Sequence, residues 1–455
     1  MTGGALSPLT DHADDPVVAS ASAVLSGPRG RYAVPMGLRR RAAMYGALSA
    51  IPVGAAALMQ THCVQAGWDT PDQFWHMCFS DLTNTYRDGA LGDGIAAYLH
   101  GGMASPAPNQ PALTGLVMTA LGSLPSVSTG SSVEQMRGYL LIWAALVAAL
   151  MAATAALTAL TTRFAPERAA LVAFSPVVAL VALISPDALG VALVAAAMWF
   201  WSRGRPVGTG VLLGLAIAAR SYPVLVVIAA VLLSLRAGRR QVAGRVAVSA
   251  VVSAGAVIGG LSLLNSTAAT ASYVSWATSG AGFGSPWVLP MLAGHPLTAT
   301  AVSALTVGGW IAAVVVGAIL ALAAPARPSL WEVSAVMVGI VLVTGASFPV
   351  QSSLWLVPLV ALVGLPWRDV LVWGFVEAVH FVAVWLHIAA QSVADRGLPG
   401  QWYAVFLILR LAVVIYLVHA VWRAAMRRRI TWPVVVDPED GPLAGRPDSF
   451  VVAFR

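Results

Sequence analysis

Apolar stretches of about 20 residues, the length that crosses a hydrocarbon core of roughly 30 Å as a helix, recur along this chain from Ala42 to Trp422. Because backbone groups in lipid must satisfy one another's hydrogen bonds, such long continuous segments favour helices over a β-barrel. The chain is 58% hydrophobic and 10% charged, whereas a soluble domain carries about 25% charged residues. The sequence therefore predicts an all-α, multi-pass membrane protein.

The arginines indicate how the chain is threaded. Arg39, Arg40 and Arg41 directly precede the first span, so the positive-inside rule places the N-terminus in the cytoplasm and the following loop outside. With twelve spans, most later arginines fall on the inside and both termini are cytoplasmic. This topology explains the net charge of +7, and no nucleic-acid partner is expected. The expected spans are 42–60, 137–162, 168–185, 187–202, 206–219, 221–235, 245–265, 298–323, 331–347, 352–366, 369–390 and 402–423.

The remaining sequence divides around this transmembrane domain, 39–425. Residues 1–38 are rich in Asp, Pro, Gly and Ser without a helical period, which predicts a disordered cytoplasmic N-terminus. The first extracytoplasmic loop, 61–136, is expected to carry the functional site. The polar residues 426–455 are expected to form a loose cytoplasmic tail.

Several apolar segments are short or interrupted. The stretch 112–125 is short for a span, and if it crossed, every later arginine cluster would change sides; it is expected to be re-entrant or interfacial. Prolines break SPVVALVALISPD and ARSYP. Non-helical backbone at membrane depth is tolerated only where protein or a water-filled cavity shelters it. The breaks therefore predict a cavity that opens on the outer side.

The polar part of the first loop, 61–110, concentrates the residues that could carry chemistry. It holds both cysteines, Cys63 and Cys78, and being on the oxidising side they are expected to form a disulfide. Asp81, in MCFSDLTNTY, has two interpretations: a helix cap, or a carboxylate at the lipid–water boundary that accepts a proton from a hydroxyl. A solvated loop face explains the weaker candidates Asp69, Asp72, Asp88 and Asp93.

Arg220, in AIAARSYPVLVV, is an arginine within apolar sequence, which is costly. It either snorkels to the interface or grips a phosphate with its planar fork, in which case Tyr222 could add a hydroxyl donor. Asp187 either caps a helix or pairs with Arg220. Both alternatives stay open at this point.

Aromatic and polar residues recur at the other outer boundaries. Trp276, Phe283 and Trp287 fit either an interfacial aromatic belt or a surface on which a sugar stacks. Gln351 and Trp355, in FPVQSSLWLVPL, have the same two interpretations.

Charged residues also occur inside the last two spans. Glu377 and His380 lie one helical turn apart, which predicts a buried polar pair that faces the cavity. Arg410 could snorkel or pair. No group of His, Cys, Asp and Glu has convincing metal-ligand spacing, and there is no Asp-x-Asp pair, so neither a metal nor another cofactor is expected.

Four stretches together resemble the actinobacterial GT-C membrane glycosyltransferases of glycosyltransferase family 87, which use polyprenyl-phosphate sugars. The resemblance extends from about Cys63 to Trp422, and the second stretch is its most specific part. The four stretches are Cys78–Asp81 with Tyr86, residues 185–227, Gly284–Trp287, and Gln351–Leu359.

The resemblance implies a GT-C fold in the plasma membrane with an extracytoplasmic site. It implies Asp81 as the catalytic base and Arg220 with Tyr222 at the donor phosphate, although many relatives have Lys at the arginine position. The implied partners are a polyprenyl-phosphate sugar, commonly mannose, a glycolipid or glycan acceptor, and membrane lipids. Further substrate contacts are expected from Ser80, Tyr86, Asn109, Trp287, Gln351, Trp355, Glu377 and His380.

One departure concerns the acceptor. Relatives often have Glu-Tyr-Pro where this chain has Asn109-Gln110-Pro111. If that glutamate binds the acceptor, the choice of acceptor differs here.

Other functions remain as alternatives. The donor could carry arabinofuranose, and the chain could be a secondary transporter, a lipid flippase or a non-catalytic assembly partner. Transporters usually show internal repeats and bind at the membrane centre. We see no repeat between the two halves, and the polar residues gather at one face, which favours the enzyme.

Overall fold

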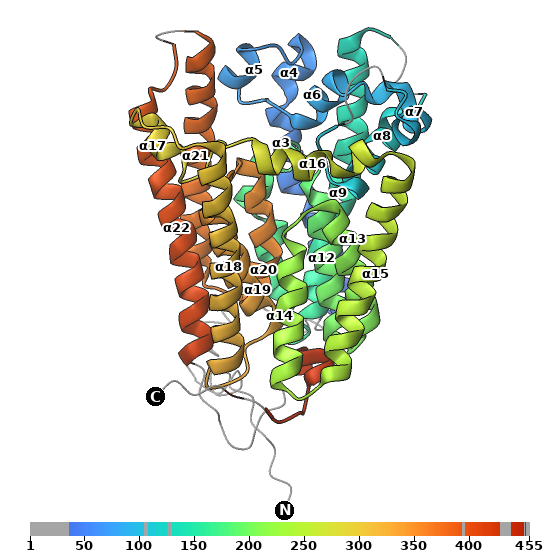
Figure 1. Cartoon of the computed structure of the whole chain (residues 1–455), viewed down its shortest axis with the longest axis vertical. Coiled ribbons are helices and arrows are strands. Elements are labelled where there is room, and N and C mark those ends of the chain that lie inside the picture. The colour runs from blue at the N-terminus through green and yellow to red at the C-terminus, as the bar shows by residue number, and fades with distance from the viewer. Residues whose placement is uncertain are drawn as a thin grey trace, which may run out of the picture.

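The computed structural model describes residues 36–103, 108–125, 127, 130–393, 396–427, 438–449 and 451. Within these ranges the chain forms α-helices and short 3₁₀ helices and no strand, which confirms the all-α prediction. Most helices run side by side in one bundle (Figure 1). We call the end that carries residues 61–103, at the top of Figure 1, the loop end, and the opposite end the tail end. The predicted disordered N-terminus lies almost entirely outside the described residues.

Among the described residues, six helical segments are long and apolar enough to cross a membrane, so the chain is a helical membrane protein. The first segment, Leu38–Met59, combines α2 (Leu38–Leu48) and α3 (Ala50–Met59); the others are α9 (Ser132–Thr161), α15 (Arg240–Leu264), α18 (Ala299–Ala323), α21 (Trp367–Ser392) and α22 (Gly400–Arg427). All except α21 bury at most a third of their most apolar stretch, so these five form the outer wall of the bundle.

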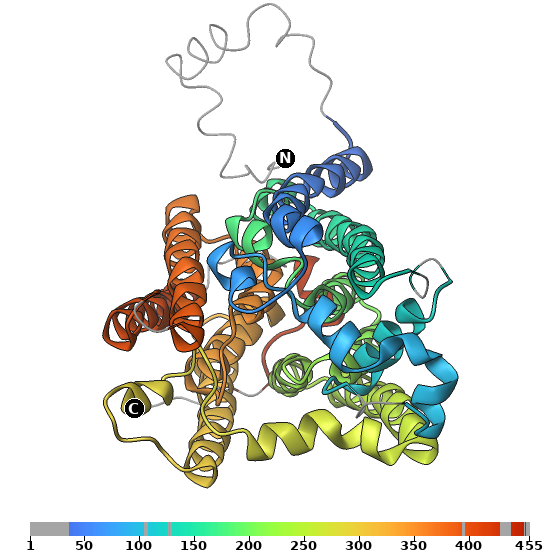
Figure 2. The same cartoon turned by 90° about the horizontal axis from the view of Figure 1, so that it is seen from above.

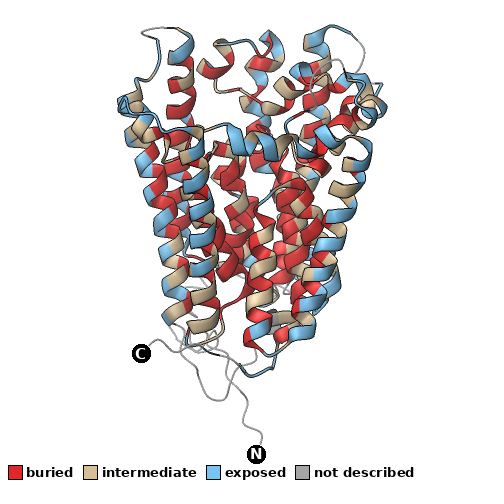
Figure 3. Ribbon diagram, in the orientation of Figure 1, coloured by how far each residue is buried: buried red, intermediate tan, exposed pale blue. Residues whose placement is uncertain are grey.

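Shorter apolar helices fill the interior, where most buried residues lie (Figure 3). At 16 residues, the longest extends about 24 Å, less than a full hydrocarbon core. Short helices are tolerated here because surrounding protein shelters their ends. They are α12 (Asp187–Ser202), α13 (Pro206–Ala219), α14 (Pro223–Arg236), α19 (Leu330–Thr344), and the pair η3 (Val350–Trp355) and α20 (Leu356–Val363), whereas the short apolar helix α8 (Ala112–Gly122) lies at the loop end (Figure 1).

Two predicted segments differ from a simple span. The stretch 112–125 contains only α8, which at 11 residues extends about 16 Å and is too short to cross by itself. The expected span over 168–185 is interrupted, as the prolines of SPVVALVALISPD predicted. Prolines begin new helices there, because proline has no N–H to continue the previous one. The segment consists of η2 (Pro166–Ala169), α10 (Ala170–Ala173) and α11 (Pro176–Val181).

Capping residues and prolines determine where several helices begin. Ser131 and Glu134 form a capping box at α9, and Ser329 and Glu332 form another at α19. Pro206 and Pro223 occupy the first helical positions of α13 and α14. The backbone between α13 and α14 is therefore free of both helices and can face a cavity.

Helix α13 is held against α15 by small residues. A Cβ atom on Gly210 would meet Ser249 Oγ at 1.9 Å, and one on Gly214 would meet Ser253 Oγ at 2.0 Å. The Ser253 hydroxyl donates to the carbonyl of Val211 at 2.9 Å. Such glycines let two backbones approach closely in a membrane, and this packing fixes the end of α13 that leads to the break.

The tail end is closed by a segment that was expected to be loose. Residues 438–449 begin with η4 (Pro438–Leu443) and pack under α12 and α14 (Figure 1). Arg236, fully buried, pairs with Asp448 at 2.7 Å, and Arg327 pairs with the same carboxylate at 2.8 Å. For these residues the prediction of a loose tail is wrong; residues 428–437 lie outside the described ranges.

Candidate functional site

A cavity of about 450 Å³ opens at the loop end of the bundle. Its walls come from segments far apart in the sequence: the start of α6 (Asp81–Asp88), the α13–α14 break, α18, α19, η3, and α16 (Ser266–Thr278). Seen from above, α16 lies across the end of the bundle between α15 and α18 (Figure 2). The sequence predicted that helix breaks face a cavity, and the α13–α14 break does so at Arg220 and Ser221.

Asp81 is anchored at one wall of the cavity through its own backbone. Its N–H donates to the carbonyl of Ile184 at 2.7 Å, and the Ser80 hydroxyl donates to the carbonyl of Leu183 at 2.7 Å. Asp81 is the first residue of α6, and the residue that precedes the helix, Ser80, makes no side-chain cap bond. Asp81 therefore does not occupy the N-cap position that the capping interpretation assumed. Instead, its Oδ2 accepts a hydrogen bond from Gln351 Nε2 at 3.1 Å.

The surroundings of Asp81 change its acidity. Burial among protein atoms raises the pKa of the carboxyl to about 7 by removing water from the charged form. The negative charge of Asp187 raises the pKa further, and the positive charge of Arg220 opposes both effects. A carboxylate of this kind is half protonated near neutral pH and can exchange a proton with a bound hydroxyl.

Arg220 and Asp187 form an ion pair, which is one of the two alternatives for Asp187 and excludes snorkelling for Arg220. Arg220 Nε lies 2.6 Å from Asp187 Oδ1, and Nη2 lies 3.3 Å from Oδ2. The side chains are 12% and 4% exposed, so Arg220 does not snorkel. Its Nη1 donates to Gln110 Oε1 at 2.9 Å. Asp187 also accepts bonds from the Trp355 indole, at 2.7 Å, and from the Ser185 hydroxyl.

Tyr222 contacts this cluster through Trp355. Its ring stacks on Trp355 with centroids 4.6 Å apart and an interplanar angle of 15°. The ring is fully buried and does not line the cavity, whereas Trp355 does. The Tyr222 hydroxyl has no hydrogen-bond partner within the described residues. Tyr222 therefore lies near Arg220, but its ring packs on Trp355 and does not reach the cavity.

The acceptor motif of the sequence analysis lies at the same cavity, next to Arg220. Asn109 and Gln110 both line it, and Asn109 Nδ2 donates to Ser275 Oγ on α16 at 2.7 Å. Two tryptophans, Trp276 and Trp310, complete an aromatic lining. Trp310 is a residue that sequence reasoning missed, because it sits within a long apolar helix with no polar neighbour to mark it.

Some predicted contacts lie outside the cavity. The Tyr86 hydroxyl is 3.5 Å from the Val127 carbonyl and its ring packs on Tyr139. The Trp287 indole donates to the carbonyl of Thr344 at 2.9 Å. Neither side chain lines the cavity, so both serve the packing around it.

Glu377 and His380 also lie away from the cavity, in the buried interface of α21 and α22. Glu377 pairs with Arg410 at 3.0 Å rather than with His380, and it accepts the Ser353 hydroxyl at 2.7 Å. Arg410 therefore pairs instead of snorkelling. Its other N–H groups donate to the carbonyls of Phe348 and to Pro349, the latter at 3.2 Å. This network holds the segment that leads into η3.

The loop beside Asp81 is cross-linked. Cys63 and Cys78 form a disulfide, and the indole of Trp68 donates to the Cys78 carbonyl at 3.1 Å. Both bonds hold the backbone directly before Ser80 and Asp81. Within the described residues, the one group of three side chains that could hold a metal ion, around His62, lies outside the cavity.

A second cavity, of about 720 Å³, lies at the start of α2. Among the described residues, its lining consists of apolar residues and four arginines, Arg39, Arg40, Arg163 and Arg203, without a carboxylate. That lining offers no base for hydroxyl chemistry, and the cavity at Asp81 is the candidate functional site. No protein-family model matches this chain, and no curated protein matches it significantly.

Proposed function

We propose that the protein is an inverting glycosyltransferase of the GT-C fold. It moves a sugar, mannose before arabinofuranose, from a polyprenyl-phosphate donor to a lipid-linked or polysaccharide acceptor on the extracytoplasmic face of the plasma membrane. The observation that carries the proposal is that one cavity holds both a carboxylate of raised pKa, Asp81, and a partly buried guanidinium, Arg220. A hydroxyl nucleophile and an anionic leaving group require these two functions.

Asp81 acts as the general base. Its carboxylate accepts the proton of an acceptor hydroxyl while the hydroxyl oxygen attacks the anomeric carbon. The bond from that carbon to the phosphate oxygen breaks on the opposite face, and polyprenyl phosphate leaves with the electron pair, so the configuration inverts. A base whose pKa lies near 7 is well matched to this step at neutral pH.

Arg220 stabilises the leaving phosphate. Asp187 occupies the Nε–Nη2 edge of the guanidinium and fixes its orientation, whereas Nη1 contacts only the neutral oxygens of Gln110 and Ala219. A phosphate oxygen is a stronger acceptor than an amide and would replace Gln110. The positive charge then offsets negative charge that grows on the phosphate. This role needs no metal ion.

The aromatic lining suits a sugar. Trp276, Trp310 and Trp355 line the cavity beside small residues, and its volume of about 450 Å³ falls in the range of small-molecule sites. The twelve-span topology is part of the proposal. It is supported by the six long helices together with the shorter apolar helices between them.

Transfer assays in membranes test the proposal. Radiolabelled polyprenyl-phosphate mannose and polyprenyl-phosphate arabinose are offered separately to the wild type and to Asp81→Asn. We expect transfer from one donor and a loss of about 10² to 10⁴-fold in the variant, the usual contribution of a general base. Asp88→Asn is the matched control, because Asp88 is exposed on the same helix and should keep full activity.

Two results would contradict the proposal. An active Asp81→Asn protein would remove the assigned base. Absence of transfer from both donors, in membranes where the protein is folded, would favour the transporter alternative.

A further inference from the structure

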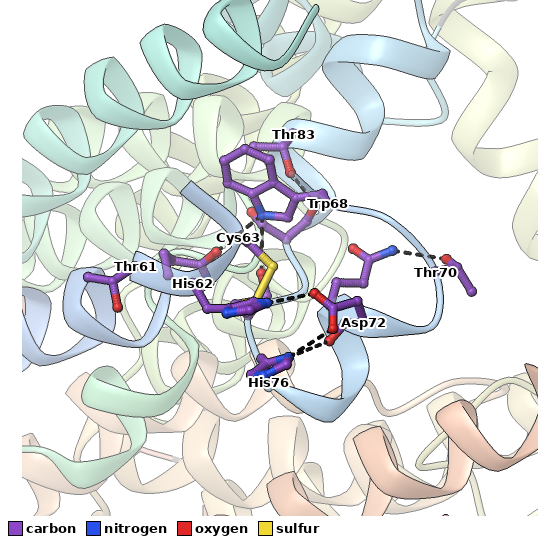
Figure 4. The surroundings of a disulfide bond; sticks show 12 residues. Thr61, His62, Cys63, Trp68, Thr70, Asp72, His76 and Thr83 are labelled. Carbon is purple, nitrogen blue, oxygen red and sulfur yellow. Dashed lines mark hydrogen bonds and ion pairs between the residues drawn. A yellow bond between two sulfur atoms is a disulfide. The ribbon is translucent and has the colours of Figure 1, made fainter. Parts of the chain in front are cut away.

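Three side chains with metal-binding atoms converge beside the disulfide (Figure 4). His62 comes from α4 (Thr61–Ala66), and Asp72 and His76 come from α5 (Asp72–Trp75) and the residue that ends it. His62 Nε2 lies 2.6 Å from Asp72 Oδ2, and His76 Nδ1 lies 3.2 Å from Asp72 Oδ1. All three ligand atoms lie within 4.8 Å of one another.

We propose that His62, Asp72 and His76 form a binding site for a divalent transition-metal ion of the zinc class. Two imidazole nitrogens and one carboxylate oxygen are a donor set that zinc uses, and three protein ligands leave a fourth position for water. The set does not suit magnesium or calcium, which prefer oxygen ligands alone.

The present spacing is close to what the ion requires. With bonds of about 2.0–2.2 Å, ligand atoms around a tetrahedral zinc ion lie about 3.4 Å apart. His76 Nδ1 lies 3.2 Å from Asp72 Oδ1, which is close to this value. His62 Nε2 lies 2.6 Å from the other oxygen, Oδ2, so the His62 and Asp72 side chains must turn for both nitrogens and one carboxylate oxygen to meet the ion.

The backbone that carries the three residues is already fixed. Cys63 follows His62 directly, Cys78 lies two residues after His76, and the disulfide joins them. The two imidazole rings lie stacked, with centroids 3.5 Å apart and an interplanar angle of 12°. A site held in this way loses little chain entropy on binding.

The site is accessible from solvent and separate from the transfer cavity. The side chains of His62, Asp72 and His76 are 38%, 40% and 44% exposed, and none lines the cavity at Asp81. A bound ion would cross-link α4 to α5 beside Cys78 and so stiffen the backbone that leads to Asp81. The inference does not depend on the proposed transferase activity.

Metal titration of the full chain in detergent tests the site. The purified protein is stripped with a chelator, dialysed, and titrated with Zn²⁺ in a calorimeter. We expect one ion per chain in the wild type and at least a tenfold loss of affinity in His62→Gln and in His76→Gln. His100→Gln is the matched control, since His100 is an exposed histidine of the same loop. Co²⁺ gives a second readout, the visible absorption of a four-coordinate ion, which the same two variants should lose.

Equal zinc affinity in the wild type and both variants would overturn the proposal, as would an equal loss in His100→Gln. Glutamine can keep a hydrogen bond to Asp72, so the variants are expected to fold; elution volume and the retained disulfide check this. If either variant aggregates, Asp72→Asn replaces it in the same titration. Zinc binding that Asp72→Asn leaves unchanged would then overturn the proposal.

Discussion

The side-chain amide of Gln351 donates a hydrogen bond to the Asp81 carboxylate at 3.1 Å, although 270 residues separate the two. Each partner is held by a different structure. Asp81 is fixed to the carbonyl of Ile184, and Gln351 belongs to η3, which follows the backbone that Arg410 holds. The contact therefore forms only when the cavity wall that carries Asp81 and the wall that carries Gln351 are packed together.

Loss of this contact should change the acidity of the proposed base. A hydrogen bond to the charged form of a carboxyl lowers its pKa, so Gln351→Ala should raise the pKa of Asp81. We expect kcat/KM to fall by up to about tenfold below pH 7, for a shift of about one pKa unit, and to recover at pH 9. Rates measured across pH check this. A loss of the same size at every pH would mean that Gln351 binds substrate instead.

The wild type should itself show a single acid limb. The pKa of Asp81 is raised from 3.8 to about 7, and the base must be deprotonated to act, so kcat/KM should rise with pH through about 7 and then level off. Asp187 contributes to the raised value. Asp187→Asn should therefore move the limb to lower pH. A limb that stays in place in this variant would contradict the electrostatic coupling of the two carboxylates.

Arg410 should be a positioning residue whose loss costs stability and activity together. Arg410→Gln leaves Glu377 buried without its charge partner, which typically costs about 3–5 kcal/mol, and it releases the carbonyls of Phe348 and Pro349. Arg368→Gln is the matched control, because the Arg368 side chain is 83% exposed in its pair with Asp369. Thermal unfolding in detergent compares them. Equal melting temperatures would contradict the assigned role of the buried pair.

The packing of α13 on α15 predicts that replacing glycine by alanine changes the stability of the protein in opposite directions at two positions. In Gly214→Ala the new methyl group would lie 2.0 Å from Ser253 Oγ, and such overpacking costs about 1–3 kcal/mol. In Gly255→Ala, on α15, it would meet nothing within 4 Å, and the better helix propensity of alanine should stabilise by up to about 1 kcal/mol. Melting temperatures of the two variants should move in opposite directions, and a common direction would contradict the packing argument.

Much of the helical scaffold could be predicted from the sequence, because the length of an apolar stretch and the position of a proline determine the structure of the residues next to them. The all-α architecture and the break at Arg220 were both visible in this way. The prolines of SPVVALVALISPD predicted the interruption within 168–185, although apolar composition alone marks that stretch as a single span. Composition averages over a window, whereas a single proline acts at one peptide.

Contacts between distant segments could not be predicted. The choice of Asp187 between a cap and Arg220 depends on how α12 meets the α13–α14 break, which no local pattern encodes. Glu377 was expected to face the cavity, but the buried charge of Arg410 on the neighbouring helix attracts it instead. The approach of His62 to Asp72 and His76 was not predicted either, because it joins two separate helices, which the disulfide of Cys63 and Cys78 links.

The ion pairs of Asp448 impose an order on how this protein is made. Membrane helices are inserted while the ribosome is still translating, and Asp448 is synthesised 121 residues after Arg327 and 212 residues after Arg236. Neither of these two pairs can form until translation has passed Asp448, by which time α14 and α18 have already been delivered to the bilayer. Closure of the tail end is therefore a late event in biosynthesis, and a stop codon placed after residue 427 would leave it permanently open.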